Sequence, residues 1–461
     1  MRFYSGKVVT LLFVVFSVCV FSLWMNSSFA DEEKCTSEYQ SCVKTNFDKH
    51  WKHWDDRESG QIILQHDAFD SKHIDNQFDI FACDEVTLAC NAGRVPDFKK
   101  FLERRATFPD ADWLESKPEN EAIDVAKLKQ ALKTAGGITN FRSILVAKNG
   151  KLIAEEYYKR KDDPRPQHIQ SITKSITSLL IGIAIDQGVI ESEKEVIEPY
   201  FSEYFSKPHD KRKEKITIEG LLTMSSRLNF ADSPYYSEYE NTASWHEPGS
   251  WRAYWAADNF LDRALNTDLV ETDDEIAGIY NTPACNLLTT VLKRSANMNS
   301  KEFADKYLFG PLGIKNYVWH HDSDYNYVGG HTIFIRPRDL ARIGQMILDG
   351  GNYQGRQIVS EEWLEKSFHP TVSKLTTTDD GKASFDYGYL WWLGEHQGYD
   401  YQFGWGFGGQ FLFLIPNANT LVVTTAYPDP TGHTHWLRSQ KIIQEVMHTV
   451  IEALPENTLN E

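Results

Sequence analysis

The sequence lacks the motifs that bind nucleotides and catalytic metals, and it is poor in positive charge. It contains no glycine-rich phosphate loop, no dinucleotide-binding fingerprint, no His-Glu-x-x-His motif and no internal repeat. The 461 residues include 48 Lys and Arg against 65 Asp and Glu, which gives a formal net charge of −17. A chain this acidic does not bind nucleic acid through bulk charge, so we expect no nucleic-acid partner.

Long apolar runs are absent after the first thirty residues, and no later stretch is long enough to span a membrane. Arg2 and Lys7 precede the apolar run Val8–Trp24, and residues 28–30 form a small-residue cleavage site before Asp31. This pattern predicts a signal peptide at residues 1–30, an exported protein that is periplasmic or secreted, and no transmembrane domain after its removal. The alternative is an uncleaved segment that holds the protein at the membrane, because Val8–Trp24 is close to the spanning limit.

Cysteine is also sparse, and its positions are uneven. Four of the six cysteines fall in an N-terminal segment that we delimit at residues 31–107, as Cys35, Cys42, Cys83 and Cys90. In an exported chain this number predicts two disulfides, for which three connectivities are possible. A zinc site is the alternative, although these spacings are wide for one. Cys285 stands in an apolar context and is expected to be a buried, inert thiol.

One stretch combines chemically reactive side chains with an apolar helix. Ser171 and Lys174 form an S-x-x-K motif and begin a run that is nearly all apolar as far as Ile185. Such a run predicts a buried helix that begins near Ser171, with the lysine one turn on and on the same face as the serine. Desolvation there would lower the pKa of the lysine, and a neutral amine can take a proton from a serine hydroxyl. The alternative is a helix cap followed by a solvated lysine, since S-x-x-K is short and Ser41 and Lys44 also match it.

The remaining pattern predicts strands at both ends of the main segment and helices between them. Expected helices cover residues 123–135, 216–225, 286–292, 303–312, 337–348 and 436–454, and a long surface loop covers 232–255. Expected hairpins pair 143–147 with 152–157 around Asn149-Gly150, and 411–415 with 420–425, while 387–392 forms a strand-like run. The order indicates an α/β (α+β) class with one antiparallel sheet built from both ends and an inserted helical region.

Several motifs in this order resemble those of the serine β-lactamase, penicillin-binding protein and esterase superfamily, in particular its class-C-like branch with 6-aminohexanoate-dimer hydrolases and carboxylesterases. The resemblance runs from about Trp113 to Ala453. It rests on blocks at 144–157, 171–175, 221–225, 280–282, 311–314, 337–342 and 406–410. It implies a β-lactamase/DD-peptidase-like fold, with a hydrolase domain at 108–455 and a tail at 456–461.

The resemblance also implies roles for individual residues. Ser171 would be the nucleophile that forms an acyl-enzyme, and Lys174 would activate it. Tyr280 matches the tyrosine of the Y-x-N motif, which acts as a general base with the lysine and then as an acid toward the leaving group. The backbone N–H groups of Ser171 and Phe407 would form the oxyanion hole, with Phe407 on the edge strand of the third motif.

The chain departs from the family pattern at positions expected to contact substrate, namely Thr282, Trp405 and Gly406. Thr282 replaces the Asn of Y-x-N, and Gly404-Trp405-Gly406 replaces the cationic K-T-G triplet. That triplet helps to dock the carboxylate of β-lactams and D-Ala-D-Ala peptides, so a neutral or short-chain ester or amide is favoured instead, with Trp405 as an apolar surface. Arg227 replaces a usual glycine, and residues 275–277 replace a usual Pro-Gly approach to the tyrosine.

Three functional hypotheses follow. The first is an exported serine hydrolase that cleaves a small-molecule ester or amide through Ser171 and needs no metal or other cofactor. The second is a penicillin-binding DD-peptidase or a β-lactamase. The third is a catalytically silent binding or sensor protein on the same fold. The sequence leaves the oligomeric state open.

Overall fold

The computed structural model describes residues 113–158, 166–229, 260–270, 278–321, 325–377, 384–427 and 432–456, which all belong to one compact unit of the chain. The predicted signal peptide, the four N-terminal cysteines, the loop predicted at 232–255 and the block at 275–277 lie outside these residues. The domain boundaries proposed at 31, 108 and 456 stay predictions. No helix in the described ranges is long and apolar enough to cross a membrane.

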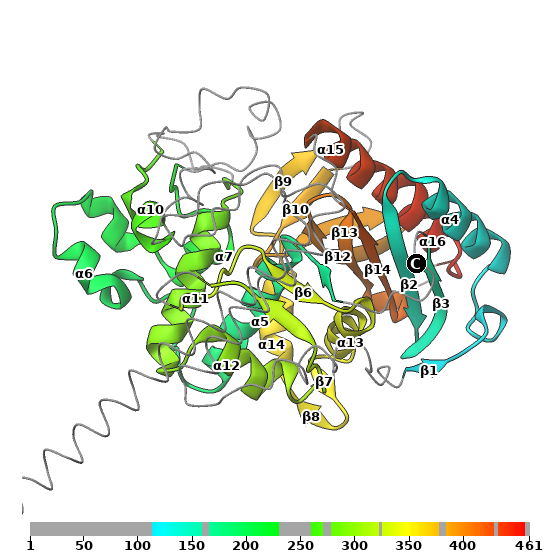
Figure 1. The fold of residues 1–461 in the computed structure, drawn as a ribbon, viewed down its shortest axis with the longest axis horizontal. Coiled ribbons are helices and arrows are strands. Elements are labelled where there is room, and N and C mark those ends of the chain that lie inside the picture. Colours follow the sequence, from blue (N-terminus) through cyan, green and yellow to red (C-terminus); the bar gives the residue numbers. More distant parts are fainter. Residues whose placement is uncertain are drawn as a thin grey trace, which may run out of the picture. The chain divides into compact units, whose positions relative to one another are not determined.

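A nine-stranded sheet forms the centre of the unit (Figure 1). Every neighbouring pair of strands is antiparallel except β1 with β3. The N-terminal hairpin pairs with the C-terminal one through β2 and β14, so the predicted sheet built from both ends of the segment is confirmed. In spatial order the strands are β1 Leu114–Glu115, β3 Lys151–Tyr157, β2 Phe141–Lys148, β14 Thr420–Ala426, β13 Gln410–Ile415, β12 Tyr399–Gly406, β11 Trp392–His396, β10 Ser384–Tyr387 and β9 Val372–Thr377.

The central strands are apolar on both faces because helices cover both. All residues of β2, β13 and β14 are buried. Asn149 (φ 52°) and Gly150 (φ 73°) make the turn between β2 and β3, as the Asn-Gly pair predicts. One face of the sheet carries α4 Val125–Gly137 and the C-terminal helix, which runs as α15 Gly432–Lys441, a π-helical segment Ile442–Met447 and α16 His448–Glu452. The other face carries α5 Ile172–Asp186 and α13 Pro337–Leu348.

The inserted helical region lies beside the sheet (Figure 1) and confirms the predicted helices in its described part. Its helices start at capping side chains: Thr217 caps α7, Asn281 caps α11 and Asn299 caps α12. Besides α5 and α13, the described helical elements between β3 and β9 are α6 Ser202–Phe205, α7 Ile218–Leu222, α10 Phe260–Asn266, α11 Thr282–Ala296, α12 Ser300–Ala304, a π-helical turn Asp305–Phe309, α14 Glu361–Ser367 and the 3₁₀ turns Glu198–Phe201 and Lys211–Lys215. Outside this region, the 3₁₀ turn Pro118–Asn120 precedes α4 and the 3₁₀ turn Pro416–Ala418 joins β13 to β14. Two small sheets contain β4 Gln167–His168, β6 Ile333–Ile335 and β5 Tyr317–Trp319, and β7 Asn352–Tyr353 with β8 Arg356–Gln357.

Two sequence predictions are wrong. The run 387–392 is not one strand: Tyr387 ends β10, Trp392 begins β11, and residues 388–391 connect them, with Leu390 at a φ of 62°. The run is apolar because it packs inside the unit, where the Leu390 N–H donates to the Leu222 carbonyl. In addition, β12 is not an edge strand, since β11, β10 and β9 lie outside it, and Phe407 falls in the turn after it.

Candidate active site

The start of helix α5 holds Ser171 and Lys174 in a way that excludes the capping alternative. Ser171 occupies the N-cap position, but its side chain makes no capping hydrogen bond to the helix. Lys174 is 1% exposed, and every residue from Ile172 to Ala184 is buried. A lysine this deeply buried is not a solvated first-turn residue.

The Lys174 amine is the centre of the site. Its Nζ lies 3.0 Å from Ser171 Oγ, 2.8 Å from Thr282 Oγ1 and 2.8 Å from the Gly330 carbonyl oxygen. The Gly330 carbonyl can only accept a hydrogen bond, whereas a hydroxyl can also donate. When the amine is neutral, its two N–H groups can donate to Gly330 and Thr282, which leaves the lone pair for the Ser171 hydroxyl. The geometry therefore fits proton transfer from Ser171 to Lys174.

Two glycines allow the Gly330 carbonyl, the third contact of the Lys174 amine, to lie within hydrogen-bond distance of it. A Cβ atom at Gly329 would lie 2.1 Å from the Cys285 carbonyl oxygen, and one at Gly330 would lie 2.4 Å from Thr282 Cγ2. Only residues without a side chain allow this segment to lie against the start of α11. Sequence reasoning missed Gly330, and the adjacent glycine pair was the available signal.

Tyr280 lies beside the lysine, just before α11. The Lys174 Nζ atom is 4.8 Å from the centroid of the Tyr280 ring, which stacks on Trp392 at 5.5 Å. Both neighbours of the tyrosine are held by Met224: the Ile279 N–H donates to its carbonyl (2.8 Å) and the Asn281 N–H to its sulfur (3.3 Å). The block at 221–225 thus positions the tyrosine.

Two departures from the family pattern have a visible local consequence. Arg227 adopts a φ of 62°, a conformation that favours glycine. Its carbonyl accepts a hydrogen bond from the Val270 N–H at 2.9 Å, and its Nη2 donates to the Val270 carbonyl at 3.1 Å. Thr282, at the position of the family asparagine, receives a hydrogen bond from Lys174. Its predicted contact with substrate stays a prediction.

The end of β12 packs directly on the start of α5. A Cβ atom at Gly404 would lie 3.0 Å from Ile172 Cγ2 and 3.1 Å from Ser175 Oγ, and one at Gly406 would lie 2.3 Å from the Ile169 carbonyl oxygen. The glycines therefore bring the strand, and with it the Phe407 turn, against the residues that precede Ser171. A side chain at position 404, where the K-T-G triplet has its lysine, would press against Ile172 and Ser175 in this packing.

Trp405 alternates with these glycines and so points to the opposite face of the sheet. It is partly exposed and stacks on Trp436 of α15, with the ring centroids 5.2 Å apart and the planes at 18°. It also stacks on Phe411 at 5.7 Å. The predicted contacts of Trp405 and Gly406 with substrate stay predictions.

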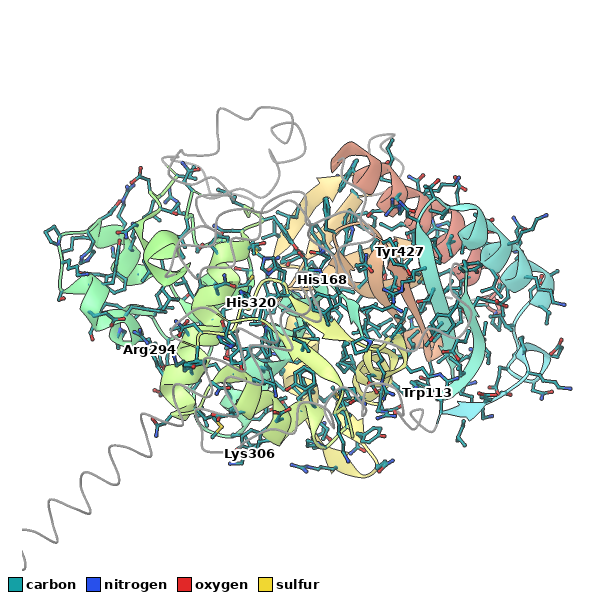
Figure 2. The ribbon with its side chains drawn as sticks, in the orientation of Figure 1. Trp113, His168, Arg294, Lys306, His320 and Tyr427 are labelled. Carbon is teal, nitrogen blue, oxygen red and sulfur yellow. The ribbon has the colours of Figure 1, made fainter. Side chains whose placement is uncertain are left out.

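Two buried histidines near the site carry no charge at neutral pH. Burial, and then the charge of Lys174, holds the pKa of His331 well below its usual 6.5. Burial lowers the pKa of His168 (Figure 2) to about 3. The buried His168 ring stacks on Phe334, with the ring centroids 4.5 Å apart. No group of three or more His, Cys, Asp or Glu residues within the described ranges is arranged to hold a metal ion.

The buried His168 predicts a loss of stability in acid. Between pH 6.5 and about 3 the unfolded chain binds a proton at this residue and the folded chain does not, so the stability falls as the pH falls. The loss at pH 5 is on the order of 2 kcal/mol relative to pH 8. His168→Phe can keep the stack on Phe334 but has no group that titrates. In urea titrations at pH 8 and pH 5, the difference between the free energies of unfolding at the two pH values should therefore be smaller in this variant by about that amount. An unchanged difference would contradict the assignment.

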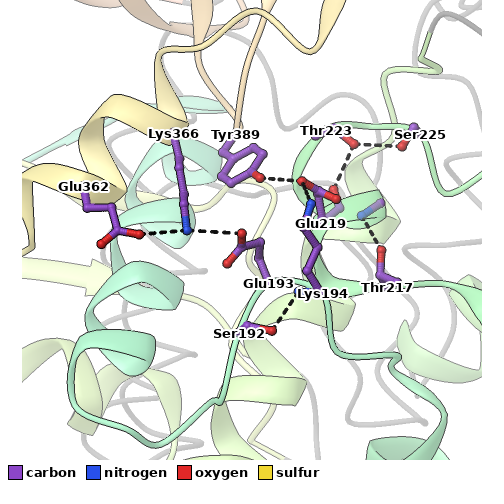
Figure 3. Close-up of polar contacts among 11 residues, drawn as sticks. Ser192, Glu193, Lys194, Thr217, Glu219, Thr223, Ser225, Glu362, Lys366 and Tyr389 are labelled. Atoms are coloured by element: carbon purple, nitrogen blue, oxygen red, sulfur yellow. Dashed lines mark hydrogen bonds and ion pairs between the residues drawn. The ribbon is translucent and has the colours of Figure 1, made fainter.

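A polar cluster supports the connection that lies against α5 (Figure 3). Ser175 Oγ donates to the Leu390 carbonyl at 2.8 Å. The neighbouring Tyr389 hydroxyl donates to Glu219 Oε1 at 2.6 Å, and Lys194 pairs with the same carboxylate. Burial, and then the Glu219 carboxylate, raises the pKa of Tyr389, so the phenol stays protonated. The cluster thereby ties the 388–391 connection to helix α7.

Tyr389→Phe is expected to destabilise the protein by about 1.5–3 kcal/mol, because it removes a partly buried hydrogen bond to a charged group. The measurement is urea unfolding at pH 7. Because the Tyr389 hydroxyl contacts Glu219 and not Lys174, the effect of this variant on any catalytic rate should stay within about threefold. A larger stability loss after Tyr353→Phe, on the partly exposed strand β7, would contradict the role of the Glu219 contact.

Comparison with known proteins places this geometry in context. The family model described as Beta-lactamase matches residues 130–438. The chain is 27% identical over 310 residues to the 6-aminohexanoate-dimer hydrolase of Paenarthrobacter ureafaciens, which covers 64% of this chain and 76% of the relative. The octameric penicillin-binding protein homologue from Pyrococcus abyssi has a TM-score of 0.53 at 17% identity and covers 72% of this chain and 80% of its own. A D-stereospecific amidohydrolase from Streptomyces sp. has a TM-score of 0.52 at 13% identity and covers 69% of this chain and 98% of its own.

Proposed function

The chain belongs to the Beta-lactamase family, and from this membership we propose that it is an exported serine hydrolase that cleaves a small ester or amide through an acyl-enzyme on Ser171. The observation that carries the proposal is the buried Lys174 amine within hydrogen-bond distance of the Ser171 hydroxyl. A serine hydroxyl that donates a hydrogen bond to the lone pair of a buried, neutral amine is an activated nucleophile, because the amine can take its proton.

The first half of the reaction forms the acyl-enzyme. Ser171 Oγ attacks the substrate carbonyl carbon while its proton passes to Lys174 Nζ. The negative charge moves to the carbonyl oxygen, which accepts hydrogen bonds from the Ser171 and Phe407 N–H groups. The C–O or C–N bond to the leaving group then breaks, and the leaving group takes a proton from Tyr280, which regains one from Lys174.

The second half releases the acid. Water attacks the ester carbonyl of the acyl-enzyme and loses its proton to the Lys174–Tyr280 pair. The tetrahedral intermediate collapses, the bond to Ser171 Oγ breaks, and the proton returns to that oxygen. Ser171, Lys174 and Tyr280 are then in their starting protonation states, so the proposed reaction consumes only substrate and water.

The substrate is expected to lack the carboxylate that β-lactams and D-Ala-D-Ala peptides present. Gly404 packs against Ile172 and Ser175, and no cationic side chain stands at this point of β12. The relative at 27% identity is named as a hydrolase of the 6-aminohexanoate dimer, which supports a small amide substrate. That dimer itself ends in a carboxylate, so the preference for an uncharged substrate rests on the packing of Gly404 and not on this relative. We therefore favour a neutral ester or amide over a β-lactam.

The experiment that tests the proposal is intact-protein mass spectrometry after treatment with a fluorophosphonate and, separately, with benzylpenicillin. We expect a fluorophosphonate adduct on the wild-type chain and none on Ser171→Ala. Turnover is then measured with p-nitrophenyl esters of short acids and with the 6-aminohexanoate dimer as a linear amide. An adduct that persists in Ser171→Ala would refute the assignment of Ser171 as the nucleophile, and a stable penicillin adduct would favour the penicillin-binding DD-peptidase of the second hypothesis.

Export is proposed from the first thirty residues alone. The mature chain should begin at Asp31. Two disulfides among the four N-terminal cysteines would make its unreduced mass about 4 Da lower than its reduced mass, because each bond removes two hydrogens. A chain that keeps its N-terminus in the membrane fraction would support the anchored alternative.

A further inference from the structure

The turn between β12 and β13 carries the Phe407 N–H group, and side chains from other elements hold each of its carbonyl groups. Gln410 Nε2 donates to the Phe407 carbonyl (3.4 Å), Arg438 Nη1 donates to that of Gly408 (3.1 Å), and Thr424 Oγ1 donates to that of Gly409 (3.0 Å). The peptide planes of the turn are therefore fixed from outside it.

The orientation of these planes decides where the Phe407 N–H group points. The Gly406 carbonyl faces the inside of the turn, where it accepts a hydrogen bond from the Gly409 N–H at 3.3 Å. In a trans peptide the C=O and the following N–H point in opposite directions, so the Phe407 N–H is directed away from the interior of the turn. Gly406 itself lies against the Ile169 carbonyl, two residues before Ser171.

The turn has little rigidity of its own. Gly408 and Gly409 have φ values of 87° and 101°, and glycine moves readily among several backbone conformations. An oxyanion hole requires donors that are already oriented before charge develops. The turn therefore depends on hydrogen bonds from outside it to keep one conformation. Among these, the bond from Arg438 comes from helix α15, which packs on the sheet, and not from a strand of the sheet.

Arg438 is built into this position. It comes from α15, it is 4% exposed, and its Nη1 atom joins the Gly408 carbonyl at 3.1 Å to the Tyr427 carbonyl at 2.6 Å. Tyr427 follows the last residue of β14. One guanidinium thus connects the turn, the end of β14 and the C-terminal helix.

We propose that Arg438 is a positioning residue that sets the orientation of the Phe407 N–H group in the oxyanion hole. It acts through the Gly408 carbonyl and touches no reacting atom. The inference rests on the proposed function, because it assigns a purpose to the turn only if an oxyanion forms beside Ser171.

The test is the kinetics of Arg438→Met, which keeps much of the stem and removes the donors. We expect kcat/KM for a p-nitrophenyl ester to fall about 10- to 100-fold, less than the loss seen when an oxyanion donor is deleted outright. KM should change by less than about threefold, and the rate of fluorophosphonate labelling should fall with kcat. The pH profile should keep its shape, because Lys174 and Tyr280 are untouched.

A matched control separates positioning from stability. Lys148 is 6% exposed, and its Nζ donates to the Ala418 carbonyl at 2.8 Å, in the turn at the far end of β13. Like Arg438→Met, Lys148→Met removes a buried cation that donates to the carbonyl of a turn. At a temperature where the Lys148→Met protein is folded, we expect its kcat to equal that of the wild type. If Arg438→Met matches Lys148→Met in both activity and melting temperature, the proposal is refuted.

A second variant covers the case in which Arg438→Met does not fold. Arg438→Lys retains a cation and donors, although it loses the planar fork, and it is expected to show a smaller fall in kcat with the same unchanged pH profile. Full activity in folded Arg438→Lys together with an unfolded Arg438→Met would show a purely structural role and overturn the proposal. Failure of the proposed function is a separate result, since the adduct would then persist in Ser171→Ala.

Discussion

Alanine at position 171 is expected to lower kcat/KM by at least about a thousandfold, because it removes the hydroxyl, 3.0 Å from Lys174 Nζ, on which the proposed acyl-enzyme forms. Binding and the oxyanion hole remain and leave a residual rate above that of water. The Ser171 hydroxyl makes one hydrogen bond to Lys174 and is partly exposed, so the free energy of unfolding should change by about 1 kcal/mol or less. Steady-state kinetics and urea unfolding on the same preparation measure both quantities.

Ser178→Ala is the matched control for this variant. Ser178 lies on the same helix and is fully buried, and its hydroxyl makes no hydrogen bond in the described part of the chain. Its removal should leave kcat/KM within about twofold of wild type. Comparable losses in Ser171→Ala and Ser178→Ala would show that α5 is sensitive to any change, and the assignment of the nucleophile would fall.

Local patterns were sufficient to predict most of the fold. The apolar runs at 144–147 and 411–415 are buried on both faces, and the Asn149-Gly150 pair makes the turn that its backbone preference dictates. Helix α13 begins and ends where its spacing predicts, at Pro337 and Leu348, because the proline starts it and apolar residues recur on one face. These signals are local, so a single sequence contains them.

The errors arose where long-range contacts decide the backbone. Leu390 is apolar and lies in a strand-like run, but its backbone is left-handed and its N–H donates to the carbonyls of Leu222 and Gly388 instead of to a neighbouring strand. Nothing in the sequence near residue 390 marks Leu222 as a partner. The position of β12 inside the sheet likewise depends on β9, β10 and β11, whose short and partly polar strands give weak periodic signals.

The site was predictable residue by residue only through the order of its motifs. Ser171, Lys174 and Tyr280 come from α5 and from the start of α11, and the structure brings the lysine within 3.0 Å of the serine and 4.8 Å of the tyrosine ring. The contribution of Gly330 was missed, because the adjacent glycine pair signals only close packing and a carbonyl group has no sequence signature of its own. Their catalytic roles stay predictions until the variants are measured.

Lys174→Met is expected to lower kcat/KM by at least about a thousandfold, because Ser171 loses the group that takes its proton. The free energy of unfolding should fall as well, because the Gly330 carbonyl and the Thr282 hydroxyl each lose a donor. Lys213→Met is the control for that second effect. Lys213 is 4% exposed and donates to the Leu265 carbonyl and the Tyr204 hydroxyl, so its removal should destabilise the chain without lowering kcat.

Lys174→Arg distinguishes a proton acceptor from a positive charge. A guanidinium keeps the charge and the donors near Ser171, but it does not give up its proton in proteins and so offers no lone pair to the serine hydroxyl. If Lys174 acts as the base, the arginine variant is as slow as the methionine variant, and fluorophosphonate labelling of Ser171 is slow in both. If the charge alone stabilises the serine alkoxide, the arginine variant retains much of the wild-type rate. Because kcat/KM and the labelling rate report the same activated oxygen, agreement between them assigns the loss to Ser171 activation and not to substrate binding.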